Sequence, residues 1–258
     1  MPPTALVTGA TAGIGLSFAR RFAAEGYDLV LVARDAVRLG AVAQELRTAY
    51  GREVEVISAD LADREQVQRV ADRLADDQRP VDVLVNNAGF GLGHGFVSGE
   101  VHDEERMLDV LCRAVLVLSH AAARSMRRRR RGAIINVSSV SGFVAMGTYS
   151  AAKAWCTAFS EGLAGELAPD GVTVTALCPG FVRTEFHQRA GMNMSRLPAL
   201  AWLDSDDLVH ACLADVRRGK VVSVPSLPYS VLVAVVRHAP RALVRRGSHA
   251  VSRGRSGG

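Results

Sequence analysis

Seven short apolar segments, separated by stretches of helical length, constrain the fold of this chain more than any other feature. Each segment has five or six residues, is nearly uninterrupted and is rich in β-branched side chains. Such runs are typical of strands in a parallel sheet that helices cover on both faces. The predicted strands are Thr4–Thr8, Asp28–Ala33, Val54–Ser58, Val81–Val85, Ala133–Val137, Val172–Leu177 and Lys220–Val224.

Between these strands the sequence predicts helices at about residues 14–25, 36–50, 63–77, 103–128, 149–168 and 204–218. Asp63 and Asp204 are typical N-cap residues, and Gly26, Gly51 and Gly171 stand where helices should end. Strands that alternate with helices form a doubly wound α/β fold with right-handed crossovers. We therefore expect a seven-stranded parallel sheet flanked by helices on both faces.

Composition limits the class of protein. The 258 residues, 48% hydrophobic and 22% charged, suit one globular α/β domain and argue against a disordered or coiled-coil chain. No apolar run reaches the roughly 20 residues that a membrane span needs. The N-terminal sequence MPPTALVTGA lacks the features of a secretory signal. The four cysteines have no metal-ligand spacing, so we expect reduced thiols, no metal site and a cytoplasmic protein.

Positive charge is concentrated near the C-terminus. Residues 237–258 hold six arginines and no acidic residue, and without them the net charge of +5 becomes −1. We expect a body at residues 1–226, an apolar and basic extension at 227–246 and a disordered tail at 247–258. Pro240 would break any single helix through the extension. We expect the extension to pack on the body, with weak contact to a membrane surface as the alternative.

A second basic cluster is the run Arg127–Arg131. It is predicted to be a solvated helix end, and the alternative is contact with an anionic membrane or with nucleic acid. The arginines have no interleaved aromatic residues, so no nucleic-acid partner is expected.

A glycine-rich turn, TGATAGIG, follows the first predicted strand and opens the first predicted helix. In this context the backbone can approach a phosphate, and the helix N-terminus supplies free N–H groups. We expect Gly9, Thr11, Gly13, Ile14 and Gly15 to bind a dinucleotide.

The second strand ends in Ala33-Arg34-Asp35, and Arg38 follows one helical turn later. An acidic residue at this strand end would bind a ribose 2′-hydroxyl, whereas an arginine suits a 2′-phosphate. Arg34 therefore favours NADP(H) over NAD(H), although Asp35 lies close to it.

Two further strand ends carry residues suited to the same ligand. Asp60 and Leu61 follow the third strand, where the adenine would lie, and the sequence NNAG follows the fourth. Small residues and amides at the carboxyl end of a strand suit a ligand edge. The predicted cofactor contacts here are Asp60, Leu61, Asn86, Ala88 and Gly89.

Tyr149 and Lys153 are four residues apart, so they share one face of a predicted helix. An ammonium beside a phenol favours the phenolate and lowers the phenol pKa. A hydroxyl such as that of Ser139 can hold a carbonyl oxygen while the tyrosine transfers a proton. We expect Ser139, Tyr149 and Lys153 to be catalytic.

Taken together, TGATAGIG, NNAG, the serine before YSAAK and the sequence CPGFVRT resemble the short-chain dehydrogenase/reductase family, from about residue 4 to 224. The resemblance implies a Rossmann fold in residues 1–226 that binds a nicotinamide cofactor, with Tyr149 as the acid/base. It implies that Lys153 binds the nicotinamide ribose and lowers the Tyr149 pKa, and that Ser139 positions the substrate. The resemblance also implies contacts on the nicotinamide side from Pro179, Gly180, Val182 and Thr184.

Two departures from the family pattern concern catalysis. Leu111 stands where the family usually has an asparagine that serves a water-linked proton relay to the lysine. Ser139 and Tyr149 are only ten positions apart, which is shorter than in many members. Ser138 and Ser141 are therefore alternative hydroxyls. These departures support a second hypothesis, a weakly catalytic or non-catalytic dinucleotide-binding sensor.

The segment 181–202 suggests the substrate. In the family this region covers the substrate, and its apolar character predicts a small apolar carbonyl or alcohol; ordinary packing is the alternative. His94 and His187 are expected to be structural. Family members often form dimers or tetramers through the helices near 103–128 and 149–168, so we expect a homodimer or homotetramer. The large apolar residues of the segment are Phe181, Phe186, Met192, Met194, Leu197 and Trp202.

Overall fold

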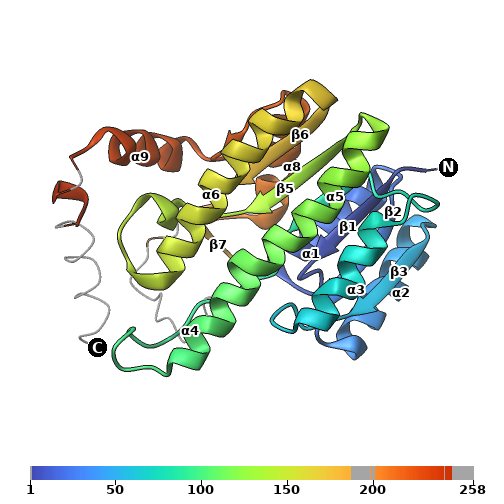
Figure 1. Ribbon diagram of the computed structural model, residues 1–258, viewed down its shortest axis with the longest axis horizontal. Coiled ribbons are helices and arrows are strands. Elements are labelled where there is room, and N and C mark those ends of the chain that lie inside the picture. Colours follow the sequence, from blue (N-terminus) through green and yellow to red (C-terminus); the bar gives the residue numbers. More distant parts are fainter. Residues whose placement is uncertain (1, 187–197, 199–200, 241, 246–258) are drawn as a thin grey trace.

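The computed structural model describes residues 2–186, 198, 201–240 and 242–245 (Figure 1). Within these residues seven strands form one sheet in the order β3-β2-β1-β4-β5-β6-β9, and every neighbouring pair is parallel. The predicted doubly wound Rossmann fold is therefore confirmed. The strands are β1 (Thr4–Thr8), β2 (Asp28–Ala33), β3 (Val54–Ser58), β4 (Val83–Asn86), β5 (Gly132–Val137), β6 (Val172–Leu177) and β9 (Val222–Ser223). A separate parallel pair joins β7 (Phe181–Val182) to β8 (Trp202–Leu203).

The helices cover both faces of the large sheet. They are α1 (Gly13–Ala24), α2 (Ala36–Tyr50), α3 (Arg64–Ala75), α4 (Val101–Leu108), α5 (Val115–Arg129), α6 (Gly147–Leu167), α8 (Ser205–Arg217) and α9 (Leu227–His238). A π-helical segment, η1 (Asp109–Ala114), joins α4 to α5, and two short 3-10 helices are η2 (Val140–Phe143) and η3 (Ala168–Asp170).

Two hydrophobic cores lie on opposite faces of the sheet. Phe18 and Phe22 of α1 belong to the first core, together with buried residues of α2 and α8. The second core joins α3, α5 and α6 to the other face, where Leu118 and Met126 are fully buried. Figure 1 shows these three helices side by side across the sheet. Continuous apolar strands therefore have a core on both sides, as their sequence predicts.

Local sequence signals account for several helix ends. The carboxylates of Asp63 and Asp204 accept backbone N–H hydrogen bonds at the starts of α3 and α8, as predicted. Gly51 ends α2 with a φ of 63°, and Gly171 has a φ of 71° after η3. A side chain would be strained at such left-handed positions, so glycine is the residue that these helix ends favour.

One predicted helix differs in the structure. The segment predicted as one helix at 103–128 begins at Val101, and its path contains η1 between α4 and α5. A π-helix adds one residue to a turn, and such segments are frequent at functional sites. Hydrophobic periodicity does not distinguish this local change from a continuous α-helix. The fourth strand is also displaced, from the predicted Val81–Val85 to Val83–Asn86.

The C-terminal extension packs on the body through α9, which ends at His238 shortly before Pro240. Proline cannot continue a helix, so this end agrees with the prediction. Among the described residues, no helix is both long and apolar enough to cross a membrane. The predicted disordered tail at 247–258 lies outside the described residues.

The arginine run at the end of α5 forms a network of ion pairs. Arg127 and Arg130 contact Asp170, and Arg129 and Arg131 contact Asp82. Arg128 contacts Asp77 at 2.7 Å. Each arginine of the run thus has a carboxylate partner, in agreement with a solvated helix end.

Candidate active site

The glycine turn and the NNAG segment meet at the carboxyl ends of β1 and β4. The strand order reverses between these two strands, and ligands of open α/β sheets bind at such a point. Gly9 has a φ of 67°, and a Cβ there would lie 2.9 Å from the Ala88 Cα. A Cβ at Gly15 would overlap the Gly9 carbonyl oxygen. The turn therefore requires glycine at both positions.

Hydrogen bonds fix the NNAG segment against the turn. The backbone N–H groups of Asn87 and Ala88 both donate to Thr8 Oγ1, at 2.9 and 3.0 Å. The Asn87 amide donates to the Thr8 carbonyl at 2.9 Å. Asn87 was absent from the predicted contacts, and it is the amide that the structure places at the turn.

Asn86 faces the protein interior. Its side-chain amide donates to Ser119 Oγ at 3.0 Å and to Asn136 Oδ1 at 2.9 Å. The Asn136 amide in turn donates to Ser160 Oγ of α6 at 2.9 Å. This buried network ties β4 and β5 to α5 and α6, so the Asn86 side chain serves the packing of the sheet.

The N-terminus of α1 points its first amides toward the turn. Ala12 occupies the N-cap and provides no side-chain acceptor, so Gly13, Ile14 and Gly15 lack a side-chain cap. Free N–H groups and the helix dipole suit a phosphate. A Cβ at Gly13 would lie 2.7 Å from the Thr184 Cγ2, so the segment after β7 closes the other side of this turn. Thr11, between the glycines, is nearly buried.

The end of β2 presents an exposed Arg34. Asp35 caps α2 by accepting a hydrogen bond from the Arg38 backbone N–H at 2.9 Å. The Arg38 guanidinium makes a bidentate contact with Glu185, at 2.6 and 3.1 Å. The Asp35 carboxylate therefore caps α2. The Arg34 side chain is exposed at the strand end where a 2′-phosphate would bind.

Asp60 and Leu61 lie at the end of β3. Leu61 is buried in the second core. Burial acts to raise the pKa of Asp60, but hydrogen bonds from the Ala62 backbone and Arg106, with the charge of Arg34, hold it below its ordinary value. Asp60 is therefore an ionised group at the same edge as Arg34.

Ser139, Tyr149 and Lys153 come together, as predicted. Tyr149 lies in the first turn of α6, and its hydroxyl is near enough to that of Ser139 for Ser139 to act on its pKa. The Lys153 Nζ lies 5.7 Å from the centre of the Tyr149 ring. It donates a 2.7 Å hydrogen bond to the Val137 carbonyl at the end of β5. The shorter Ser–Tyr loop thus still permits the contact between the two hydroxyls.

Burial governs the titration of this group. It raises the pKa of Tyr149 well above that of an ordinary phenol, and the Ser139 hydrogen bond acts in the opposite direction. Burial also lowers the pKa of Lys153, whereas the nearby thiols of Cys156 and Cys112 act to raise it. The predicted lowering of the Tyr149 pKa is not found in this arrangement, because desolvation dominates and the Val137 carbonyl holds the ammonium.

The two alternative serines have different surroundings. Ser138 Oγ donates to the Lys153 carbonyl at 2.7 Å and shares a hydrogen bond with Thr157, so it fixes α6. The buried Ser141 Oγ has no hydrogen-bond partner among the described residues, and the Ser141 backbone N–H donates to Ser139 Oγ at 3.1 Å. Ser139 is the hydroxyl that reaches Tyr149.

Leu111 is a packing residue of the π-helical segment. It forms a buried cluster with Met107 and Ala152, against which Tyr149 packs. Its Cδ2 lies 2.8 Å from the position that a Cβ at Gly89 would take. The place of the usual relay asparagine is therefore filled by an apolar side chain in contact with the site.

The CPGFVRT segment borders the same site. The Val140 backbone N–H donates to the Pro179 carbonyl at 3.0 Å, which joins this segment to the loop after Ser139. A Cβ at Gly180 would overlap the ring of Tyr229 in α9. Val182 is buried and pairs with Leu203. These contacts place the segment that is predicted on the nicotinamide side next to the loop that follows Ser139.

The apolar segment is described only in part. Phe186 lies with its ring centre 5.9 Å from that of Tyr149, and Phe181 lies 6.1 Å from Trp202. His94 contacts Asp103 at 3.5 Å, which agrees with a structural role. The predicted residues outside the described part are His187, Met192, Met194 and Leu197.

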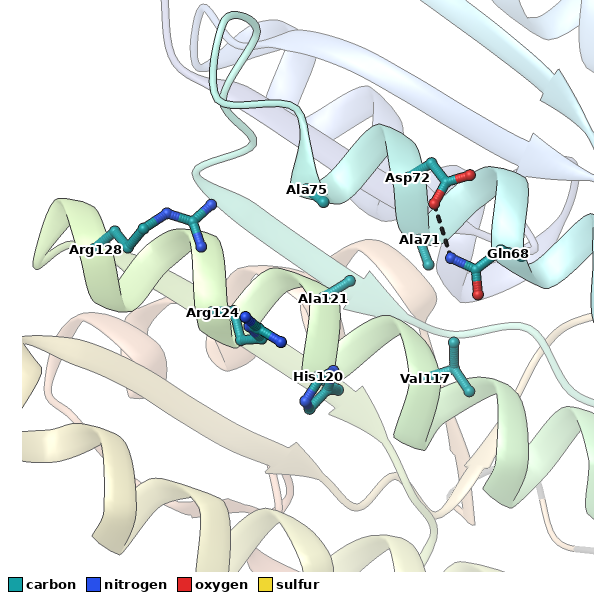
Figure 2. A pocket seen from close by; sticks show the side chains of 9 residues that line it. All are labelled: Gln68, Ala71, Asp72, Ala75, Val117, His120, Ala121, Arg124 and Arg128. Carbon is teal, nitrogen blue, oxygen red and sulfur yellow. Dashed lines mark hydrogen bonds between the residues drawn. The ribbon is translucent and has the colours of Figure 1, made fainter.

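A surface hollow of about 280 Å³ lies between α3 and α5, away from this group (Figure 2). None of the predicted site residues lines it. Gln68 and Asp72 on its α3 side are hydrogen-bonded at 2.8 Å, and His120, Arg124 and Arg128 extend from α5. The hollow is therefore distinct from the candidate active site.

Comparisons with known proteins agree with this geometry. The family model described as short chain dehydrogenase matches residues 3–194. A 3-oxoacyl-[acyl-carrier-protein] reductase of Aquifex aeolicus is 34% identical over 183 residues, which cover 70% of this chain and 74% of the relative.

Two solved structures have the same fold over most of the chain. A short-chain dehydrogenase from Sphingobium yanoikuyae in complex with NADPH has a TM-score of 0.85 and 38% identity, covering 93% of this chain and 94% of that one. A bulky-bulky ketone specific alcohol dehydrogenase from Comamonas testosteroni has a TM-score of 0.79 and 33% identity, covering 93% and 96%. With a family model that matches most of its length, this chain belongs to the short-chain dehydrogenase/reductase family of NAD(P)-dependent oxidoreductases.

Proposed function

We propose that this protein is an NADP(H)-dependent oxidoreductase that interconverts an apolar carbonyl compound and its alcohol, with Tyr149 as the acid/base. The observation that carries the proposal is the meeting of Ser139, Tyr149 and Lys153 at the sheet edge that also holds the glycine turn. The weakly catalytic alternative is less favoured, because Leu111 leaves the contact between Ser139 and Tyr149 intact.

The residues present fit a nicotinamide dinucleotide. The glycine turn admits no Cβ at Gly9 or Gly15, and the α1 N-terminus suits the pyrophosphate. The exposed Arg34 suits a 2′-phosphate. The similar protein from Sphingobium yanoikuyae is an NADPH complex, which supports the phosphorylated cofactor.

The bound cofactor supplies or accepts the hydride. In the direction of reduction, the Tyr149 hydroxyl donates its proton to the carbonyl oxygen, and its raised pKa keeps that proton in place at neutral pH. Ser139 reaches Tyr149 and can hold the same oxygen. Lys153 is fixed by the Val137 carbonyl and would bind the nicotinamide ribose.

The described surroundings of Tyr149 suggest an apolar substrate. Phe186 packs near Tyr149, Phe90 and Leu92 pack on the same apolar cluster as Tyr149, and no described carboxylate is hydrogen-bonded to it. A charged substrate would lose its hydration without a partner there. The similarity to a ketone-specific alcohol dehydrogenase supports a hydrophobic ketone.

Two further partners are proposed for this cytoplasmic enzyme. One is a second copy of the chain, because α5 exposes Leu116 and α6 carries the half-buried stacked pair Trp155 and Phe159, whose ring centres are 4.9 Å apart. The other is a membrane surface, which the extension at 227–246 would contact.

Substitution Tyr149→Phe tests the proposed function. It should lower NADPH-dependent reduction of hydrophobic ketones by about a hundredfold to ten-thousandfold, because the proton donor is lost. NADPH affinity, measured by fluorescence titration, should change little. The matched control is Tyr50→Phe at the exposed end of α2, which should keep full activity. Full turnover by the Tyr149→Phe variant would exclude Tyr149 as the acid.

A further inference from the structure

Helix α9 is attached to the body along one face. Tyr229, Val233 and Arg237 are spaced four residues apart, so they lie along one stripe of the helix. Val233 is only 5% exposed. Arg237 contacts Glu161 of α6 at 3.0 Å and lies over the ring of Phe143 at 5.6 Å. This inner face is accounted for by contacts within the chain.

The opposite face of α9 is apolar and exposed. Leu227, Val231 and Val235 repeat the same spacing two positions out of phase, which is about 200° around the helix. Their exposed fractions are 78%, 56% and 62%. Leu232 beside them and Leu243 after the helix are also exposed. Figure 1 shows α9 at the margin of the molecule, beyond α6.

Strong positive charge accompanies this apolar face. Residues 237–258 contain six of the 31 basic residues and none of the 26 acidic residues, so they carry +6 and residues 1–236 carry −1. The basic run Arg127–Arg131 is matched by carboxylates of the body, and so are the cations at the end of α8 and Arg237 of α9. The surplus positive charge of the protein therefore belongs to the end that carries α9.

The exposed apolar residues and the positive charge together indicate which kind of partner binds the outer face of α9. A second copy of the chain would bring two C-terminal segments of charge +6 together, which is unfavourable. An anionic lipid surface offers both an apolar layer for the valines and leucines and negative head groups for the arginines. We propose that the outer face of α9 (Leu227, Val231, Leu232 and Val235) binds a bilayer that contains anionic lipid.

This position matters for the reaction, in an inference that rests on the proposed function. The inner face of α9 contacts both segments that border the candidate active site: the Tyr229 ring packs on Gly180, and Arg237 covers Phe143 of η2. A bilayer on the outer face therefore lies one helix away from these segments. The substrate class that this geometry suits is a ketone or alcohol dissolved in the lipid.

Vesicle sedimentation of the full chain tests this proposal. The wild-type protein should pellet with vesicles of phosphatidylcholine and phosphatidylglycerol, and high salt or pure phosphatidylcholine should release it. The double variant Val231→Ser, Val235→Ser should partition about tenfold more weakly, because two apolar contacts are lost. Arg245→Gln should weaken partition about fivefold through the loss of one positive charge.

Matched controls lie elsewhere on the surface. Val37→Ser with Val56→Ser removes two exposed valines from α2 and β3, and Arg124→Gln removes an exposed arginine from α5. Both controls should bind vesicles like the wild type. Circular dichroism and turnover of a water-soluble ketone should be unchanged in every variant, which verifies that each is folded.

The outcomes separate this inference from the proposed function. Failure of the wild type to bind the anionic vesicles, or equal binding by the α9 double variant, would overturn the membrane contact even if ketone reduction is robust. Vesicle binding without any turnover would overturn the proposed function and leave the contact supported. Dissociation of an oligomer by the double variant, seen in sedimentation velocity, would assign the face to a second copy and refute the lipid proposal.

Discussion

At the scale of single residues, the candidate active site favours the neutral forms of its two titratable groups. Burial raises the pKa of the Tyr149 phenol and lowers that of the Lys153 ammonium. A neutral phenol is the form that can donate a proton to a carbonyl oxygen. The raised pKa of Tyr149 therefore keeps the phenol in the form that carbonyl reduction uses.

The raised pKa of Tyr149 predicts how the rates of reduction and oxidation depend on pH. Reduction needs the protonated phenol, so its rate should persist from neutral pH to about 10, the ordinary phenol pKa. Oxidation needs the phenolate, so its rate should rise with pH over the same range. Steady-state rates in both directions, with saturating cofactor, measure this. If ionisation of the phenol already decreased the reduction rate at a pH lower than 8, a raised pKa of Tyr149 would be contradicted.

The ion pair of Arg38 and Glu185 predicts an effect on cofactor choice. Glu185 follows the segment beside the glycine turn and holds the guanidinium of α2 with two hydrogen bonds. Its negative charge opposes a 2′-phosphate nearby. Glu185→Gln should therefore increase the ratio of NADPH to NADH affinity about threefold to fivefold, the size of a partly exposed charge effect.

Comparison with Glu45→Gln tests the specificity of this effect. Glu45 forms an exposed ion pair with Arg20 elsewhere on the surface, so its loss should leave the affinity ratio unchanged. If Glu185→Gln instead decreased the affinities for NADPH and NADH equally, the ion pair would stabilise the site and would not discriminate the 2′-phosphate.

Residue-level prediction from the sequence succeeds where spacing determines position. The four-residue spacing of Tyr149 and Lys153 places both on one face of α6, and the glycines follow from the turn. Spacing is less informative where the side chains of two adjacent residues point in opposite directions. Asn86 and Asn87 are the same residue type, and only the structure shows that the first joins a buried network and the second faces the turn.

At the scale of elements, the π-helical segment is the main feature that the sequence does not predict. Leu111 within it fills the place where the family usually has an asparagine, and it packs with Met107 and Ala152. An apolar periodicity looks the same for an α-helix with or without one wide turn. The sequence also does not predict the ion pair of Arg38 and Glu185, because the two residues are 147 positions apart.

The packing of Leu111 predicts the result of restoring the asparagine. Leu111→Asn would bury an amide in an apolar cluster, so the free energy of unfolding should fall by about 2 kcal/mol. Turnover should not increase. Urea unfolding and ketone reduction measure the two effects.

Leu108→Asn is the matched control, because Leu108 lies on the preceding turn and is partly exposed. Its unfolding free energy should change much less. A large gain of turnover from near zero in Leu111→Asn would favour the weakly catalytic sensor over the enzyme.

At the scale of the whole molecule, most of the fold follows from the alternation of apolar strands and helical segments. The strand order, however, is not determined by this alternation, because right-handed crossovers allow more than one order in a doubly wound sheet. Its reversal between β1 and β4 explains why the glycine turn and NNAG, far apart in sequence, form one site. The charge pattern also divides the molecule, since carboxylates of the body pair with Arg127–Arg131 but none follows Asp215 in the sequence.

We expect this sheet edge to bind a phosphorylated nicotinamide cofactor. Fluorescence titration of the purified protein with NADPH and NADH tests it most directly, since it needs no substrate. We expect NADPH to bind about tenfold more tightly or better, and Arg34→Ser to remove most of this preference, because a charged hydrogen bond to the 2′-phosphate is lost. Binding of neither nucleotide by a folded sample, or an unchanged preference in Arg34→Ser, would contradict the account.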